Sequence, residues 1–123
     1  MFLNGGVYGD TRILSPISVV EMTRNQIPGI STDFWEEHFP EAGCGLGLIL
    51  HMNKQKALWA ETLPSAETYG HGSYGGTFFW VDPVQELVGC FFSVEKHWSN
   101  RMEWLRNMRG DLFVNGVMAA IIE

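Results

Sequence analysis

The stretch from residue 70 to residue 83 reads GHGSYGGTFFWVDP, and it constrains the fold more than any other part of the sequence. Its glycines allow backbone torsions that other residues avoid, so its first half predicts a turn or a bulge. The aromatic and β-branched run at residues 77–81 predicts a strand. Asp82-Pro83 ends that run, and the connection is short enough for an antiparallel hairpin with a strand at residues 87–94. The chain is therefore expected to build an antiparallel sheet around this stretch.

The sequence before this sheet predicts one helix and a long loop. Ser15 can cap the free N–H groups at the start of a helix, and Pro16 suits its first position. We expect this helix to end near Asn25 and to bury one apolar face, made of Ile17, Val20 and Met22. Residues 31–43 carry proline, glycine and acidic side chains, which predicts a loop. Residues 1–6 resemble the last turn of a helix followed by a glycine stop.

Further strands and a C-terminal helix complete the predicted pattern. Apolar residues 46–52 predict a buried strand, and a shorter strand is expected at residues 57–62. Residues 98–108 predict a helix, Gly110-Asp111 a break, and residues 112–122 a further apolar segment. The predicted fold class is α+β, with an antiparallel sheet of three to four strands flanked by N- and C-terminal helices.

Composition and charge exclude several classes of protein. With 123 residues the chain is one domain at most, or part of one, and 46% hydrophobic residues predict a buried core. A net charge of −6 argues against nucleic-acid binding, because no basic patch is available to contact phosphates. No apolar run is long enough to span a membrane, and the first residues do not form a secretory signal. Whether a parent protein is exported stays open.

Cysteine and histidine spacing predicts neither a metal site nor a bound cofactor. The chain lacks the short paired spacings of a zinc site among His38, Cys44, His51, His71 and Cys90. The two cysteines could form a disulfide or remain free, and their apolar, strand-like surroundings favour buried free thiols. No lysine followed by serine or threonine comes after the glycines at 70–76, which argues against a phosphate-binding loop.

The residues around His71 fit a site for acyl transfer. When an acyl group is transferred, its carbonyl oxygen becomes an oxyanion and requires fixed N–H donors at short range. A strand at the edge of a sheet can supply such a donor from its backbone where small side chains let a substrate approach. Gly72 and Ser73 before Tyr74 would give that access. A glycine turn with a structural histidine is the simpler reading of the same residues.

The segment HGSYGGTFFWVDPVQELVG resembles the third active-site motif and the following hairpin of the penicillin-recognising serine hydrolases, a group that includes class C β-lactamases, DD-peptidases and related esterases. The segments MFLNGGVYGDTRILSPISVVEMTRNQIPG and GCGLGLIL are similar to earlier parts of the same family, and the apolar C-terminal helix also fits. The succession of segments covers nearly the whole chain. It implies a partial β-lactamase/transpeptidase-like fold, with residues 1–123 as the C-terminal segment of one such domain.

The resemblance also implies roles for four consecutive residues. His71 takes the first place of the family's Lys-Thr-Gly, His-x-Gly or Trp-x-Gly triplet and faces the substrate pocket. Gly72 takes the middle place and Ser73 the third, where the family usually has glycine, so its side chain could crowd the approach. The amide of Tyr74 contributes to the oxyanion hole. His71, Gly72, Ser73 and Tyr74 are therefore the predicted site residues, with no cofactor and no metal.

Two further family motifs are missing from the sequence. These hydrolases use a Ser-x-x-Lys nucleophile and a Tyr-x-Asn motif, which both precede the segment seen here. Tyr-x-Asn is absent, and Ser93-Val94-Glu95-Lys96 is the sole Ser-x-x-Lys. We do not expect Ser93 to be a nucleophile, because it ends a predicted strand, whereas the family's serine begins a buried helix.

The expected function is therefore that of an incomplete hydrolase. In the complete enzyme an acyl-serine would hydrolyse an ester, an amide or a β-lactam, and a small acyl substrate would be the ligand. This chain alone is expected to be inactive and to associate with the missing N-terminal part or with itself. A non-catalytic module that binds an acyl ligand or another polypeptide is the alternative, and a complete small α+β protein is a third interpretation.

Overall fold

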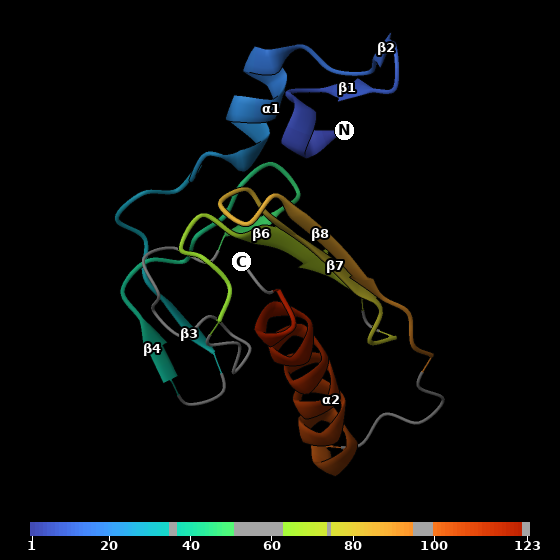
Figure 1. Cartoon of the computed structure of the whole chain (residues 1–123). Helices are drawn as coiled ribbons and strands as arrows, with labels where there is room; N and C mark the ends of the chain where they lie inside the picture. Colours follow the sequence, from blue (N-terminus) through green and yellow to red (C-terminus); the bar gives the residue numbers. More distant parts are fainter. Residues whose placement is uncertain (35–36, 51–62, 74, 95–99, 122–123) are drawn as a thin grey trace.

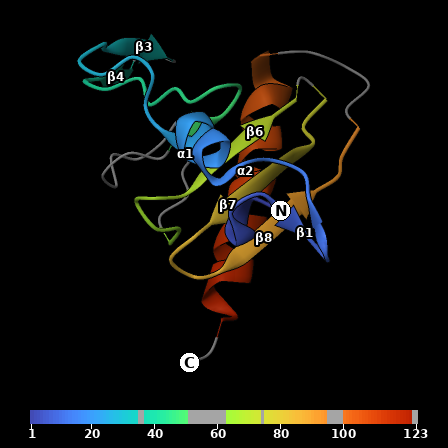
Figure 2. The ribbon, with the colours of Figure 1, turned by 90° about the horizontal axis from the view of Figure 1, so that it is seen from above.

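The computed structural model describes residues 1–34, 37–50, 63–73, 75–94 and 100–121. Its centre is an antiparallel sheet in the order β5-β6-β7-β8, with the strands β5 (Ile49–Leu50), β6 (Tyr69–Gly72), β7 (Phe78–Asp82) and β8 (Leu87–Phe91). The helix α2 (Asn100–Ala119) covers one face of this sheet. The short helix η1 (Phe2–Asn4) and the helix α1 (Pro16–Thr23) lie on the other face (Figures 1 and 2). The α+β fold with a four-stranded sheet between N- and C-terminal helices is confirmed.

Two small hairpins stand outside the central sheet. The strands β1 (Val7–Tyr8) and β2 (Thr11–Arg12) pair next to η1. The strands β3 (Thr32–Phe34) and β4 (Glu37–Phe39) pair beyond α1. The expectation of a loop over residues 31–43 was therefore wrong in part. Two short strands pair there, and the pairing satisfies backbone groups in a way that composition does not reveal. The strand expected at residues 57–62 lies outside the described residues.

Alternation along β7 divides the apolar residues between two cores. Phe79 and Val81 pack on the side of η1 and α1, in a cluster with Leu48, Tyr69, Phe2, Leu3, Met22 and Leu50. Phe78 and Trp80 pack on the side of α2, in a cluster with Val114, Met118, Leu87 and Val117. Successive side chains of a strand point to opposite faces, so this apolar strand is buried on both sides. The hairpin of β7 and β8 that Asp82-Pro83 predicts is confirmed.

Helix α2 continues through the expected break. Gly110 and Asp111 are both buried, and the helix runs without interruption from Asn100 to Ala119. A Cβ atom at Gly110 would lie 2.8 Å from Cε1 of Phe78. The glycine therefore allows α2 to approach β7 closely, and tertiary packing outweighs the low helix propensity that predicted a break.

The first helix begins as predicted but buries a different residue. The Oγ atom of Ser15 accepts a hydrogen bond of 3.1 Å from the N–H group of Ser18, and Pro16 is the first helical residue. Val19 is buried, whereas Ile17 and Val20 are 71% and 59% exposed. The apolar face expected at Ile17, Val20 and Met22 was therefore wrong at its first two members, since Met22 alone of the three packs on the sheet.

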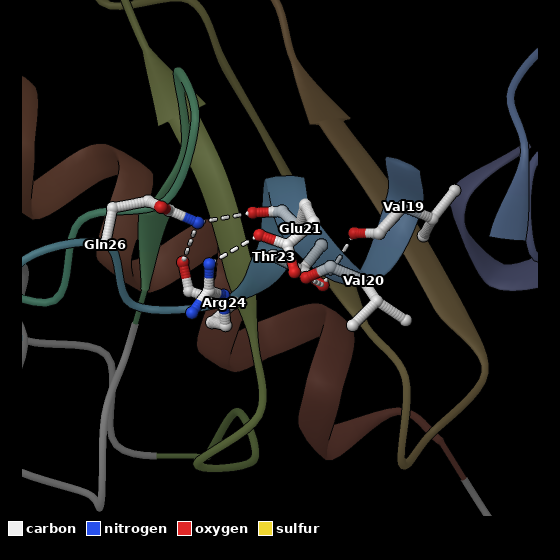
Figure 3. Close-up of polar contacts among 6 residues, drawn as sticks. All are labelled: Val19, Val20, Glu21, Thr23, Arg24 and Gln26. Carbon is white, nitrogen blue, oxygen red and sulfur yellow. Dashed lines mark hydrogen bonds and ion pairs between the residues drawn. The ribbon is translucent and has the colours of Figure 1, made fainter. Parts of the chain in front are cut away.

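Side chains close the C-terminal end of α1 (Figure 3). The Oγ1 atom of Thr23 donates to the carbonyl oxygen of Val19 at 2.9 Å. The Nε2 atom of Gln26 donates to the carbonyl oxygen of Glu21 at 2.7 Å, and Arg24 forms an exposed ion pair with Glu21. The last carbonyl groups of a helix lack partners within the helix. The side chains of Thr23 and Gln26 donate to carbonyl groups at this end of α1, before Pro28.

Both cysteines are free thiols, as expected, but they are exposed and not buried. Cys90 lies on β8 opposite Phe79, on the sheet face of η1 and α1. The apolar cluster on that face includes residues of β5, β6 and β7 and none of β8. The strand-like surroundings predicted burial because the sequence does not tell which strands the helices cover.

A buried carboxylate anchors the hairpin of β7 and β8. Asp82 is fully buried, and its Oδ1 atom accepts hydrogen bonds from the N–H groups of Val84 and Gln85 at 3.0 and 3.1 Å. The N–H group of Ser65 donates to Oδ2 at 2.7 Å, and the Oγ atom of Ser65 donates to Oδ1 at 2.7 Å. The expected turn cap is confirmed, and the same carboxylate also fixes the segment that leads into β6.

The same contacts set the charge state of Asp82. Burial acts to raise its pKa, but hydrogen bonds from the backbone and side chain of Ser65, the backbone of Gln85 and the side chain of Thr68 together lower the pKa below its usual value. We therefore expect the stabilisation from Asp82 to be complete above the pKa of an unfolded aspartate, about 3.9, and to be lost as the pH falls through the lower folded-state pKa. Urea unfolding between about pH 6 and pH 2.5 measures this loss.

Two variants make that measurement specific. Asp82→Asn cannot titrate, so the difference in free energy of unfolding between the wild type and this variant should shrink as the pH falls. Asp10→Asn, at an exposed carboxylate, should keep the pH slope of the wild type. A difference between the wild type and Asp82→Asn that stays constant over this range would contradict the lowered pKa.

Among the described residues, no helix has the length and apolar character needed to cross a membrane.

Candidate active site

His71 and Gly72 end β6, an inner strand of the sheet, and Ser73 follows them. β6 pairs with β7 over its whole length, with His71 opposite Phe79 and Gly72 opposite Phe78. The described pairs with β5 end at Gly70, opposite Ile49. Beyond Gly70, the described pairs of β6 are therefore with β7.

On the face that points toward α2, β6 carries glycines, and β7 is the strand beside them. Gly70 lies opposite Trp80, and a Cβ atom at Gly70 would lie 2.2 Å from the carbonyl oxygen of Phe79. Gly72 lies opposite Phe78 in the same register. Because side chains alternate along a strand, His71 lies on the other face, the one that carries Tyr69. Close packing against β7 thus explains Gly70, the glycine before the histidine.

His71, Gly72 and Ser73 follow one another at the boundary between the sheet and solvent. The side chain of His71 is exposed, Gly72 is half-buried and Ser73 is exposed. Tyr74, the fourth predicted residue, lies outside the described residues. The structure therefore places three predicted residues one after another, two at the end of β6 and Ser73 directly after it, and their part in catalysis stays a prediction.

A hydrogen-bonded turn connects His71–Ser73 to β7. The N–H group of Ser73 donates to the carbonyl oxygen of Thr77 at 2.7 Å, and the N–H group of Gly76 donates to the carbonyl oxygen of Ser73 at 3.0 Å. Gly76 has a φ of 88°, a torsion that favours glycine. A Cβ atom at Gly75 would meet no atom closer than 4.0 Å. The glycine pair therefore serves the shape of the turn.

Tyr69, the residue that begins β6, has a buried side chain in the core under η1. Its ring contacts Phe2 edge to face, with centroids 5.9 Å apart. Burial raises the pKa of its hydroxyl above the usual value, so the hydroxyl stays neutral at ordinary pH. Tyr69 thus anchors the start of β6 in the core, while His71 near the other end of the strand is exposed.

Among the described residues, Ser93 contacts the turn after β6. It follows β8, and its Oγ atom donates to the carbonyl oxygen of Gly75 at 3.3 Å. Its N–H group donates to Oγ1 of Thr77 at 3.2 Å. Lys96, the lysine of the Ser-x-x-Lys spacing, lies outside the described residues. The contacts of Ser93 serve the turn after β6, a role that sequence reasoning missed.

Residues that support the site from a distance in sequence were also missed. Thr77 contacts Ser93 across 16 residues, and Ser65 contacts Asp82 across 17. No local pattern predicts such pairs, because hydroxyl side chains are common in turns of every kind. Within the ranges that the structure describes, no group of three or more His, Cys, Asp or Glu residues could hold a metal ion.

The arrangement of sheet and helices defines the chain as part of a β-lactamase fold. A solved β-lactamase from Mycobacterium bovis matches 87% of this chain and 38% of its own chain with a TM-score of 0.70, at 21% sequence identity. No family model matches the sequence.

Sequence relatives specify the family. A protein of Salmonella enteritidis PT4, provisionally named D-alanyl-D-alanine carboxypeptidase, is 32% identical over 89 residues, which are 72% of this chain and 18% of that protein. A protein of Escherichia coli O157:H7 with the same name is 30% identical over 95 residues, 77% of this chain and 19% of that protein. The matched part of this chain therefore belongs to the β-lactamase-related serine hydrolases. The chain spans about a fifth of the length of these curated relatives.

Proposed function

We propose that this chain supplies the substrate-binding strand and one oxyanion donor of a β-lactamase-related serine hydrolase. The observation that carries the proposal is the position of His71-Gly72-Ser73 at the exposed end of β6, within a sheet of β-lactamase fold. The family membership of the matched residues supports the same chemistry. Hydrolysis of an ester, an amide or a β-lactam through an acyl-serine is the reaction class.

In this proposal each residue has a separate role. The N–H group of Tyr74 donates to the carbonyl oxygen of the substrate as negative charge develops on it. His71 binds and polarises the acyl group from the exposed end of β6. Gly72 keeps the backbone accessible, and Ser73 narrows the approach compared with the glycine that is usual in the family.

The attacking hydroxyl is proposed to come from polypeptide outside this chain. The sole Ser-x-x-Lys of the sequence is at Ser93, whose hydroxyl hydrogen-bonds the turn after β6. The relatives are about five times as long as the matched segment, which supports a nucleophile elsewhere. By itself the chain is then a hydrolase segment without activity, since removing the nucleophile leaves only binding and electrostatic effects.

A segment exchange tests this function. In the Escherichia coli relative, the matched 95 residues are replaced by the corresponding residues of this chain, and the exchange protein is assayed with an ester, a β-lactam and a peptide that ends in D-Ala-D-Ala. We expect hydrolysis of at least one of these, and His71→Ala should lower kcat by about tenfold or more, because it removes a group that acts on the developing charge. The three substrates distinguish the three acyl chemistries.

Controls separate chemistry from folding in this test. The isolated chain should give no acyl-enzyme burst with p-nitrophenyl acetate, whether it carries Ser93 or Ser93→Ala. Asp10→Ala is a matched surface variant of the exchange protein that should keep full kcat. A serine-dependent burst in the isolated chain, or an active exchange protein that is indifferent to His71→Ala, would contradict the proposal.

One observation favours a second function, an association module without catalysis. Phe92 and Val94, which follow β8, are 82% and 94% exposed, and Leu112 on α2 is 64% exposed. Large exposed apolar residues of this kind favour contact with another polypeptide. An exchange protein that folds but hydrolyses none of the three substrates, together with self-association of the isolated chain in sedimentation experiments, would favour this function.

A further inference from the structure

Two hydroxyl side chains, Thr77 and Ser93, hold the turn after β6 from the side of β8. We propose that Thr77 and Ser93 are positioning residues, which fix the backbone of Ser73, Gly75 and Gly76 and with it the acyl-binding end of β6. We call the hydrogen bonds of these two side chains the brace. The brace is a property of the isolated chain, whereas its effect on catalysis rests on the proposed function.

The side chain of Thr77 continues the sheet beyond the ends of its strands. The last described ladder pair of β7 and β8 is Phe78 with Phe91. Past this pair, the Oγ1 atom of Thr77 donates to the carbonyl oxygen of Ser93 at 2.8 Å and accepts from the N–H group of Ser93 at 3.2 Å. A hydroxyl can donate and accept at once, so one side chain satisfies both backbone groups of Ser93.

The backbone of Thr77 holds the other side of the turn. Its carbonyl oxygen accepts from the N–H group of Ser73 at 2.7 Å. The same residue therefore connects the end of β6 to the chain that leaves β8. A substitution of the Thr77 side chain keeps this carbonyl group and directly releases the segment after β8, 16 residues away in sequence, whose Ser93 hydroxyl in turn holds Gly75.

Ser93 adds a third contact at the tip of the turn. Its Oγ atom donates to the carbonyl oxygen of Gly75 at 3.3 Å, and both residues are half-buried. The turn itself closes through the N–H group of Gly76, which donates to the carbonyl oxygen of Ser73 at 3.0 Å. Hydrogen bonds from β8 and within the turn thus restrict a glycine pair whose torsions would otherwise be free.

Such a restriction matters where a backbone donor must meet an oxyanion. Donors of this kind act at about 2.7–3.1 Å from the oxygen, and they stabilise the transition state because their position is fixed beforehand. A misplacement of about 1 Å can cost about a hundredfold in rate. Among the described residues, the brace and the bonds of the turn hold Ser73 and Gly75, the neighbours of the proposed donor Tyr74.

Three substitutions remove the contacts in a graded way. Thr77→Val keeps the shape of the side chain and loses both of its hydrogen bonds, whereas Thr77→Ser keeps the hydroxyl and is the matched control. Ser93→Ala loses only the bond to Gly75, since its backbone groups still contact Thr77. We expect the largest effect from Thr77→Val, a smaller one from Ser93→Ala, and little from Thr77→Ser.

The brace is tested in the full chain by amide hydrogen exchange, measured by nuclear magnetic resonance. In Thr77→Val the amide of Ser93 loses its acceptor and should exchange about tenfold faster. The amides of Ser73 and Gly76 should also exchange faster, because a released Ser93 no longer holds Gly75 in the turn. The amides of Val81 and Val88, in the centre of the hairpin, should keep their rates. Unchanged exchange at all three turn amides would overturn the brace, and faster exchange throughout the sheet would show general destabilisation in its place.

The catalytic consequence is tested in the exchange protein described above. Thr77→Val should lower kcat about ten- to a hundredfold with KM little changed, and Thr77→Ser should restore kcat. Equal kcat for the two variants would overturn the positioning role, while activity of the unsubstituted exchange protein would still support the proposed function. An inactive exchange protein would overturn the proposed function and the catalytic part of this inference, and hydrogen exchange would still decide the brace.

Discussion

Replacement of Asp82 by alanine is expected to lower the free energy of unfolding by about 3 kcal/mol or more. The carboxylate of Asp82 is fully buried and accepts hydrogen bonds from the N–H groups of Ser65, Val84 and Gln85 and from the hydroxyl of Ser65. Alanine would leave these donors without their acceptor, and each unsatisfied buried donor costs about 1–3 kcal/mol. Urea unfolding near pH 7, followed by circular dichroism, measures the change.

Matched variants locate the cause of this loss. Asp82→Asn keeps one carbonyl oxygen and should lose less stability than Asp82→Ala. Asp10→Ala removes an exposed carboxylate and should change the free energy of unfolding by less than about 0.5 kcal/mol. A cost of Asp82→Ala below about 1 kcal/mol would show that other contacts hold the segment before β6.

Substitution of Gly89 by alanine is the second change with a large expected effect. A Cβ atom at Gly89 would lie 2.1–2.4 Å from three carbon atoms of the Trp80 indole. Trp80 is 3% exposed, and its ring contacts Phe78 and Phe113, so it cannot move away without cost. Overpacking of a core typically costs about 1–3 kcal/mol, and we expect a loss at the upper end of this range. Thermal or urea unfolding measures it.

Two further variants separate the clash from the loss of a glycine. Gly116→Ala lies on α2 with no atom within 4 Å of the added Cβ, so it should be neutral or stabilising by up to about 1 kcal/mol. In a Trp80→Leu background, Gly89→Ala should cost much less, because the smaller side chain leaves room for the methyl group. Equal costs in the two backgrounds would refute the contact with Trp80 as the cause.

Local signals predicted the parts of the fold that depend on neighbouring residues. Ser15 and Pro16 set the start of α1, and Asp82 with Pro83 set the hairpin of β7 and β8, because each acts on backbone groups within a few positions. The continuity of α2 through Gly110 could not be predicted, since its cause is a phenylalanine on β7. The same holds for the burial of Val19 in place of Ile17, which depends on where the sheet lies.

The candidate site divides in the same way. The His71-Gly72-Ser73 succession could be found because a family motif keeps it contiguous in sequence. The residues that hold this succession could not, because Thr77 and Ser93 meet only after β7 and β8 have paired. The sequence therefore indicates where the site is expected, and the structure adds the hydrogen bonds that hold the backbone next to it.

The two ends of the central hairpins carry different tasks. At one end Ser73 and Thr77 shape the turn after β6, and at the other end Asp82 locks the start of β6 to the turn after β7. Strands β6 and β7 separate these ends by the length of their paired residues. Substitutions at the first end can therefore accumulate without weakening the contacts of Asp82 at the second, so the sheet can vary at one end while its architecture persists.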